Sequence, residues 1–267
     1  YREFSNLGWN VSEIGLGCWA IGSEWGDVSV EDAKEALYSS IDNGINFFDT
    51  ADVYGDGRSE KIISEVLKNS NEQIYVATKA GRRLNPHNAE GYNLKNIENF
   101  IDRSLNNLGV DIIDLVQLHC PPSEICGKPE TYEMMDEIVK KGKIKYYGVS
   151  VEKVSEALDA IKYPNVKSIQ IIFNIFRQKP SEIFFHEAKK NNVAIIARVP
   201  LASGLLTGKM NNNSSFPKND HRNYNINGDA FDVGETFSGV NFSKGLEAVE
   251  ELKKILPNGF SLTDLAL

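Results

Sequence analysis

Four residues whose side chains can exchange a proton occur near the ends of three successive strand-like segments. Asp49 and Tyr54 lie in FFDTADVYG, Lys79 ends IYVATK, and His119 ends IIDLVQLH. A cation beside a phenol stabilises the tyrosinate, so Lys79 is predicted to lower the pKa of Tyr54 from its usual value of about 10. A lysine in an apolar environment tends to lose its proton, so Asp49 is predicted to supply the counter-charge that keeps Lys79 ionised.

The imidazole of His119 could hydrogen-bond a carbonyl oxygen and orient it towards the phenol, which would then protonate it. Proton transfer alone supplies no electron pair, so such a reaction needs a hydride donor, and nicotinamide is the common small-molecule source. Each residue also has a simpler structural interpretation, such as a helix-capping aspartate or a solvated lysine. Their positions at neighbouring strand ends favour one shared site, because a single geometry then explains all four.

The elements that would position these residues alternate between strands and helices. Helices are predicted after Ser29, which forms a capping box with Asp32, and before Gly109, while Pro129 and Pro180 suit the first turns of two more. Seven strand-then-helix units imply parallel strands joined by right-handed crossovers. The predicted strands cover residues 11–17, 45–51, 74–80, 112–119, 144–151, 168–174 and 194–201.

This rhythm predicts an α/β fold, a (β/α)8 TIM barrel in which the carboxyl ends of the strands share one mouth. A helix at about 243–256 follows the seventh strand, and SLTDLAL then begins another. We therefore expect a single barrel domain over residues 1–267 that is incomplete at its C-terminus and lacks strand eight and the last helix. Residues 203–242 show no strong periodicity, and a long loop of this kind is expected to cover the cofactor.

Composition limits the possible partners. The chain has 267 residues and a formal charge of −8, which argues against nucleic acid as a partner. Three cysteines form no CxxC pair, which favours a reducing compartment, and we expect a cytoplasmic protein that neither binds nor enters a membrane. The composition does not indicate an oligomeric state.

The segments DTADVYG, VATK and LVQLH resemble the active-site motifs of the aldo-keto reductases. GLGCW, GKIKYYGVS and PLASGLLTGK are in register with the same family, so the resemblance covers nearly the whole chain. It implies reversible NADP(H)-dependent reduction of aldehyde or ketone groups of small substrates to alcohols. Tyr54 would be the general acid, Lys79 and Asp49 its tuning pair, and His119 the substrate-orienting donor.

The resemblance also implies contacts with the cofactor, and NADP(H) is expected in preference to NAD(H). Two departures from the family pattern stand out: Val151 replaces a frequent amide or arginine, and Arg198 replaces the aromatic residue that stacks on nicotinamide. An arginine charge beside oxidised nicotinamide would be unfavourable. The implied cofactor residues are Gly17, Cys18, Trp19, Asp49, Ser150, Gln170, Arg198, Leu201, Ser203, Gly204, Leu206 and Lys209.

Other motifs are weaker. GLGCWA matches a dinucleotide-binding fingerprint only superficially, because a loop with two tryptophans follows it and Asp49 lies 32 residues after Gly17. HCPPSEIC fits no common zinc spacing, so no metal is expected. Trp19 and Trp25 are either core aromatics or, as we expect, walls of a substrate pocket that also includes Tyr54 and His119.

Two other functions remain open. A barrel aldolase or lyase could form a Schiff base on Lys79, although a neighbouring Asp49 would favour the unreactive ammonium. Alternatively, the chain could be a nucleotide-sensing, non-catalytic regulatory subunit, as in a channel-associated branch of the family. The intact set of four proton-exchanging residues argues against a loss of chemistry.

Overall fold

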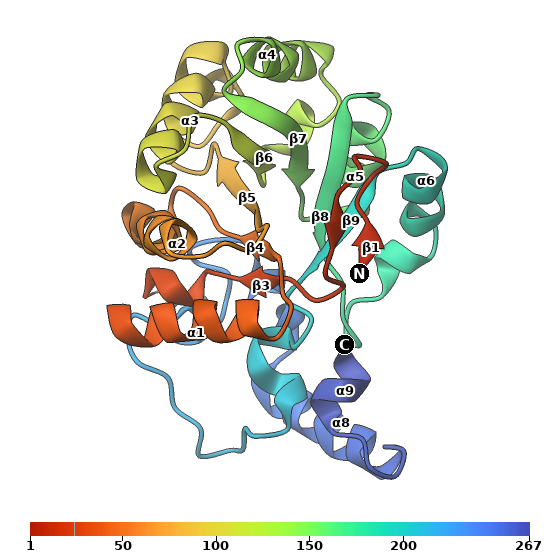
Figure 1. Ribbon diagram of the computed structural model, residues 1–267. Helices are drawn as coiled ribbons and strands as arrows, with labels where there is room; N and C mark the ends of the chain where they lie inside the picture. Colours follow the sequence, from red (N-terminus) through yellow and green to blue (C-terminus); the bar gives the residue numbers. More distant parts are fainter. Residues whose placement is uncertain (24) are drawn as a thin grey trace.

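A computed structural model describes residues 1–23 and 25–267. Seven strands form one parallel sheet in the order β3-β4-β5-β6-β7-β8-β9, and the sheet curves into a near-barrel with helices on its outside (Figure 1). A separate antiparallel pair, β1 (Arg2–Glu3) and β2 (Asn10–Val11), precedes it. The strands of the main sheet are β3 (Leu16–Gly17), β4 (Phe47–Asp49), β5 (Tyr75–Ala80), β6 (Ile113–His119), β7 (Ile144–Ser150), β8 (Val166–Ile172) and β9 (Ala194–Arg198).

The first six helices along the chain pack their apolar faces on the sheet. Leu37, Ile63, Ile97 and Ile101 are fully buried and belong to the same core cluster as Phe48 from β4. The helices are α1 (Val30–Asp42), α2 (Arg58–Lys68), α3 (Leu94–Leu108), α4 (Pro129–Lys140), α5 (Val154–Ala160), α6 (Phe184–Lys190), α7 (His221–Tyr224), α8 (Phe242–Lys254) and α9 (Leu262–Ala266).

The predicted helix boundaries agree with the structure in three places. The Ser29 hydroxyl accepts a hydrogen bond from the amide of Asp32 at 3.0 Å, which caps α1. Gly109 ends α3 in a left-handed conformation with φ 66°, and Pro129 is the first residue of α4. The prediction for Pro180 was wrong in detail, because this residue lies in a short 3-10 helix (Lys179–Ser181) and α6 begins only at Phe184.

Three predicted strands are clearly shorter than expected, and one of them, predicted over residues 45–51, is reduced to Phe47–Asp49. Residues 11–17 are divided between β2, which pairs with β1, and the two-residue β3. The seventh strand ends at Arg198 rather than at residue 201, because Val199 adopts a positive φ of 56° and the following Pro200 has no amide hydrogen for a ladder.

Residues 203–242 are more structured than a plain loop. They include most of the 3-10 helix η6 (Ala202–Thr207), together with α7, η7 (Val233–Glu235) and η8 (Phe237–Gly239). With α8 and α9, which lie next to each other away from the sheet (Figure 1), η6 and Phe237 form a separate apolar cluster. The Ser203 hydroxyl ties this region together by donating to the Glu235 carbonyl (3.1 Å) and accepting from the Phe237 amide (3.0 Å).

In the described part of the chain, β3 and β9 are the two edges of the sheet and do not pair with each other. A cavity of about 1210 Å³ follows both edges and is also lined by Tyr54 and His119. The cavity therefore joins the gap between the edge strands to the carboxyl ends of the strands. None of the described helices is both long enough and apolar enough to cross a bilayer.

Candidate active site

Lys79 lies at the centre of the predicted group of four residues. Its ammonium Nζ is 2.7 Å from the Asp49 carboxylate, 3.2 Å from the Tyr54 hydroxyl and 2.8 Å from the Thr50 carbonyl. Only 1% of the Lys79 side chain is exposed. Burial alone would lower the pKa of Lys79, but the Asp49 carboxylate and Tyr54 outweigh it and raise the pKa, so Lys79 is an ammonium at neutral pH.

Asp49 is held by a chain of polar groups from neighbouring strands. Its second carboxylate oxygen accepts from the amide nitrogens of Gln117 (3.2 Å) and Gln170 (2.8 Å), and Gln170 accepts in turn from the Ser150 hydroxyl (3.1 Å). The strand register explains this arrangement, because Lys79 pairs with Gln117 and Ser150 with Gln170 at the carboxyl ends of β5 to β8. The carboxylate that neutralises Lys79 is therefore fixed in orientation.

Tyr54 reaches this centre from the turn after β4. Gly22 and Gly55 allow the close backbone approach that holds the turn, since a Cβ atom on Gly55 would lie 2.5 Å from the Gly22 carbonyl oxygen. The predicted lowering of the Tyr54 pKa below its usual value was wrong, because burial outweighs the Lys79 ammonium and raises the pKa to about 12. The phenol is therefore protonated at neutral pH, and the Lys79 ammonium would stabilise a tyrosinate at this position.

His119 packs against the phenol, with its ring 6.0 Å from that of Tyr54 in an edge-on arrangement. Burial, followed by the positive charges of Arg82, Lys79 and Arg198, lowers the pKa of His119 well below its usual value. The imidazole is therefore neutral at physiological pH. Its role as a donor to the substrate stays a prediction.

A group of charged residues lies near His119, and only Arg198 among them had been singled out from the sequence. The Glu235 carboxylate lies 2.9 Å from the Arg82 guanidinium and 3.4 Å from that of Arg198, while Glu152 lies 3.6 Å from Arg82. Burial would raise the pKa of Glu235, but the two arginines lower it to about 2. The carboxylate is therefore ionised and neutralises the charge of Arg198.

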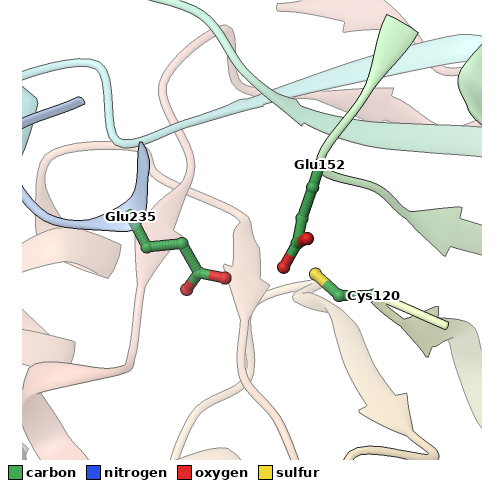
Figure 2. Close-up of side chains that lie close together, drawn as sticks. All are labelled: Cys120, Glu152 and Glu235. Atoms are coloured by element: carbon green, nitrogen blue, oxygen red, sulfur yellow. The ribbon is translucent and has the colours of Figure 1, made fainter. Parts of the chain in front are cut away.

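Cys120 completes this charged group, as Figure 2 shows by the way its side chain and those of Glu152 and Glu235 approach one another. One ligand atom from each lies within 4.8 Å of the others, a spacing that suits a metal ion. Both carboxylates, however, are already paired with guanidinium groups, and burial raises the pKa of the Cys120 thiol. The charges of this cluster are thus balanced within the protein.

The structure divides the predicted cofactor and substrate residues into two sets. Cys18 and Leu206 are fully buried and do not line the cavity, and Lys209 is exposed at the surface. Lys79 does not line the cavity either, although Asp49 and Tyr54, which it contacts, do. The predicted residues that line the cavity are Gly17, Trp19, Trp25, Asp49, Tyr54, His119, Ser150, Gln170, Arg198, Leu201, Ser203 and Gly204.

The two tryptophans form an aromatic wall with a residue that sequence reasoning missed. His221 of α7 packs against Trp19 at 4.6 Å and Trp25 at 4.5 Å between ring centroids, and Trp19 stacks on Tyr54 at 6.0 Å. Burial lowers the pKa of His221 to about 4, so its ring is neutral. His221 therefore adds no charge to this aromatic wall beside the phenol.

The residues at this mouth fit a nicotinamide cofactor. The Ser150 hydroxyl and the Gln170 amide can pair with a carboxamide, and the buried Nε of Arg198 is a donor with no hydrogen-bond partner within residues 1–23 and 25–267. Val151 presents its carbonyl oxygen to Arg198 at 3.3 Å, which helps to fix that guanidinium. A bound oxygen atom would satisfy the remaining Arg198 donor.

Comparison with known proteins agrees with this geometry. The model of the aldo/keto reductase family matches residues 13–267. The uncharacterized oxidoreductase YqkF of Bacillus subtilis is 34% identical over 211 residues, which span 78% of this chain and 67% of YqkF. Aldo-keto reductase YhdN of the same organism is 32% identical over 262 residues, which span 96% of this chain and 75% of YhdN.

Among solved structures, the glycerol dehydrogenase AKR11B4 from Gluconobacter oxydans matches with a TM-score of 0.78 and 30% identity, over 99% of this chain and 80% of that one. The chain therefore belongs to the aldo/keto reductase family, whose members are oxidoreductases that use nicotinamide cofactors. The predicted (β/α)8 fold class is confirmed.

Proposed function

We propose that this protein reversibly reduces aldehyde or ketone groups of small substrates to alcohols, with NADP(H) as the cofactor. The observation that carries the proposal is the position of Lys79, whose Nζ contacts both the Asp49 carboxylate and the Tyr54 hydroxyl beside a large cavity. The cofactor supplies hydride to the carbonyl carbon. Tyr54 donates the proton that the carbonyl oxygen then needs, and Lys79 stabilises the tyrosinate that remains.

The pairing of Arg198 with Glu235 supports the use of a nicotinamide at this mouth. An unpaired guanidinium would repel oxidised nicotinamide, but the Glu235 carboxylate lies 3.4 Å away and compensates its charge. Ser150 and Gln170 would hold the carboxamide, and Gly17 and Trp19 would border the ring. Leu201, Ser203 and Gly204 would lie along the rest of the cofactor.

The charge state of Lys79 argues against Schiff-base chemistry. A lysine nucleophile must be neutral, whereas the pKa of Lys79 is raised and its ammonium makes three hydrogen bonds. The buried position of Lys79 also leaves little room for a covalent adduct. We further propose a cytoplasmic location, which the three unpaired cysteine thiols support.

The test is a panel of aldehydes and ketones with NADPH and with NADH, followed by the loss of reduced-nicotinamide absorbance. We expect substrate-dependent oxidation that is faster with NADPH. A parallel reaction with borohydride should trap no substrate on Lys79. Substrate trapped on Lys79, or no oxidation of either cofactor with any carbonyl compound, would contradict the proposal.

A further inference from the structure

Gln117 is a polar residue inside β6, and its side chain is fully buried. Its Nε2 donates to Asp49 Oδ1 at 3.2 Å, while its Oε1 has no hydrogen-bond partner within residues 1–23 and 25–267. The reverse orientation of the amide would set Oε1 against a carboxylate oxygen, so the contact with Asp49 determines which way the amide points. A buried amide with one end unpaired is destabilising compared with an apolar side chain of similar size. That cost comes together with a contact to the counter-ion of Lys79.

Gln170 contacts the same carboxylate oxygen, but it lies in a different place. Its Nε2 donates to Asp49 Oδ1 at 2.8 Å, and its Oε1 accepts from the Ser150 hydroxyl at 3.1 Å. Gln170 and Ser150 both line the cavity, whereas Gln117 does not. A ligand in the cavity can therefore compete with Asp49 for the amide of Gln170, while the amide of Gln117 is shielded from it.

The strand register places the two glutamines in successive layers of the barrel. Gln170 pairs with Ser150, which pairs with His119, so these three residues form the layer at the mouth. Gln117 lies two residues before His119 on the same face of β6 and pairs with Lys79, so it belongs to the layer beneath. A ligand that enters the mouth meets the first layer and leaves the second intact.

We propose that Gln117 is a positioning residue that keeps the Asp49 carboxylate facing Lys79 when Gln170 turns to the cofactor. This inference rests on the proposed carbonyl reduction, in which Gln170 holds the nicotinamide carboxamide. Without cofactor, both glutamines hold Asp49 Oδ1. Once the carboxamide engages Gln170, Gln117 is the donor that remains to this oxygen among the described residues. The Asp49 side chain is 16% exposed and would otherwise be free to turn into the cavity.

The position of the Asp49 carboxylate affects the proton affinity of its neighbours. Burial is the largest influence on the pKa of both Lys79 and Tyr54, and the charge of Asp49 raises both values because it favours the protonated form of each group. If the carboxylate turns away, both groups therefore lose their protons at lower pH. Loss of Gln117 should move the high-pH limb of kcat to lower pH, whereas loss of the Lys79 cation would move it to higher pH.

The first test is kcat against pH with NADPH and the best carbonyl substrate of the wild-type protein. Gln117→Leu and Gln117→Met, two apolar replacements of which either suffices, should lower kcat by on the order of tenfold to a hundredfold and move the high-pH limb to lower pH. The control Ser168→Ala removes an equally buried polar atom that has no partner in the described residues, and it should leave the limb in place. A limb that stays in place in the Gln117 variants, or moves equally in Ser168→Ala, would overturn the inference.

The second test needs no turnover. In a fluorescence titration with NADPH, Gln170→Leu should weaken binding by roughly tenfold, the loss expected for one hydrogen bond, while Gln117→Leu should leave the affinity nearly unchanged. Equal losses in the two variants would show that the glutamines do not divide these tasks.

A crystal structure of Gln117→Leu with NADPH should show the Asp49 carboxylate turned away from Lys79, whereas the wild-type complex should keep the contact. An intact contact in the variant would overturn the role of Gln117. Absence of carbonyl reduction in the wild-type protein would contradict the proposed function instead, and the two cofactor-bound structures would still decide whether Gln117 positions Asp49.

Discussion

The ammonium nitrogen of Lys79 lies 3.2 Å from the hydroxyl oxygen of Tyr54, and the same nitrogen lies 4.9 Å from the centre of the Tyr54 ring. This contact joins a buried cation to the only group of the four that is suited to give up a proton to substrate. Burial holds the phenol protonated, and the cation favours its deprotonation once an acceptor arrives. The two effects act on the same oxygen in opposite directions.

Lys79→Met should raise the pKa of Tyr54 further, because only burial and nearby carboxylates would then act on the phenol. The rate of carbonyl reduction should fall by roughly a hundredfold to ten-thousandfold. The high-pH limb of the pH-rate profile should also move to higher pH. The measurement is kcat against pH for wild type, Lys79→Met and the control Lys145→Met, which removes an exposed ion pair with Asp114. A profile that stays in place in Lys79→Met would refute the coupling.

Glu235→Gln should destabilise the protein, since it leaves the guanidiniums of Arg82 and Arg198 without their shared carboxylate. Breaking a buried ion pair typically costs about 3–5 kcal/mol in the free energy of unfolding. The control Glu247→Gln removes an exposed pair with Lys244 and should cost less than about 1 kcal/mol. Urea unfolding at pH 7 measures both, and equal effects would show that Glu235 is not a buried partner.

The ion pairs of Glu235 with Arg82 and Arg198 also predict that the stability of the fold depends on pH. The pKa of Glu235 is lowered to about 2 from an ordinary value of 4.5, so its stabilising effect is complete above about pH 4.5 and is lost as the pH falls towards 2. The difference in unfolding free energy between wild type and Glu235→Gln should therefore shrink over that range. A difference that is constant with pH would show that the carboxylate charge is not responsible.

Asp52 gives a pH dependence of the opposite sign. Its two carboxyl oxygens are buried without hydrogen-bond partners in the described residues, and burial, with the charge of Glu60, raises its pKa from 3.8 to about 7. A group with a raised pKa stabilises the fold only while it is protonated, so this contribution is complete below about pH 4 and is lost as the pH rises through 7.

Asp52→Asn should remove this loss of unfolding free energy at high pH, which amounts to at most about 4 kcal/mol. Wild type should therefore become less stable than Asp52→Asn between pH 4 and pH 8. Unfolding by urea at several pH values tests the difference, with Asp56→Asn as the control at an exposed carboxylate. Parallel stability curves for wild type and Asp52→Asn would mean that Asp52 is ionised at little cost.

The sequence predicted the contacts around Lys79 better than the charged residues near them. Asp49, Lys79 and His119 could be recognised because each ends or nearly ends a strand, and parallel strands bring such positions to one rim. Tyr54 could be recognised from its motif. The lengths of the first and last strands could not, because the pairing of residues 10 and 11 with an N-terminal strand and the positive φ of Val199 depend on tertiary contacts.

Arg82 and Glu235 illustrate why the rest of the site was missed. They are 153 residues apart, and Glu235 lies in a segment with no periodicity, so no local pattern links the two. Gln117 was missed for another reason, since it lies inside β6 and a polar residue within an apolar strand does not by itself reveal its partner. Contacts such as Arg82–Glu235 and Gln117–Asp49 depend on the tertiary fold and cannot be recognised from local sequence patterns.

The measurement that most directly tests the central role of Tyr54 is the turnover of Tyr54→Phe with NADPH and the best carbonyl substrate, made together with a fluorescence titration of cofactor binding. The variant keeps the ring that stacks on Trp19 and removes only the hydroxyl that contacts Lys79. We predict that kcat falls by on the order of a hundredfold to ten-thousandfold while cofactor affinity is nearly unchanged. Wild-type turnover in Tyr54→Phe would contradict the assignment of this phenol as the proton donor.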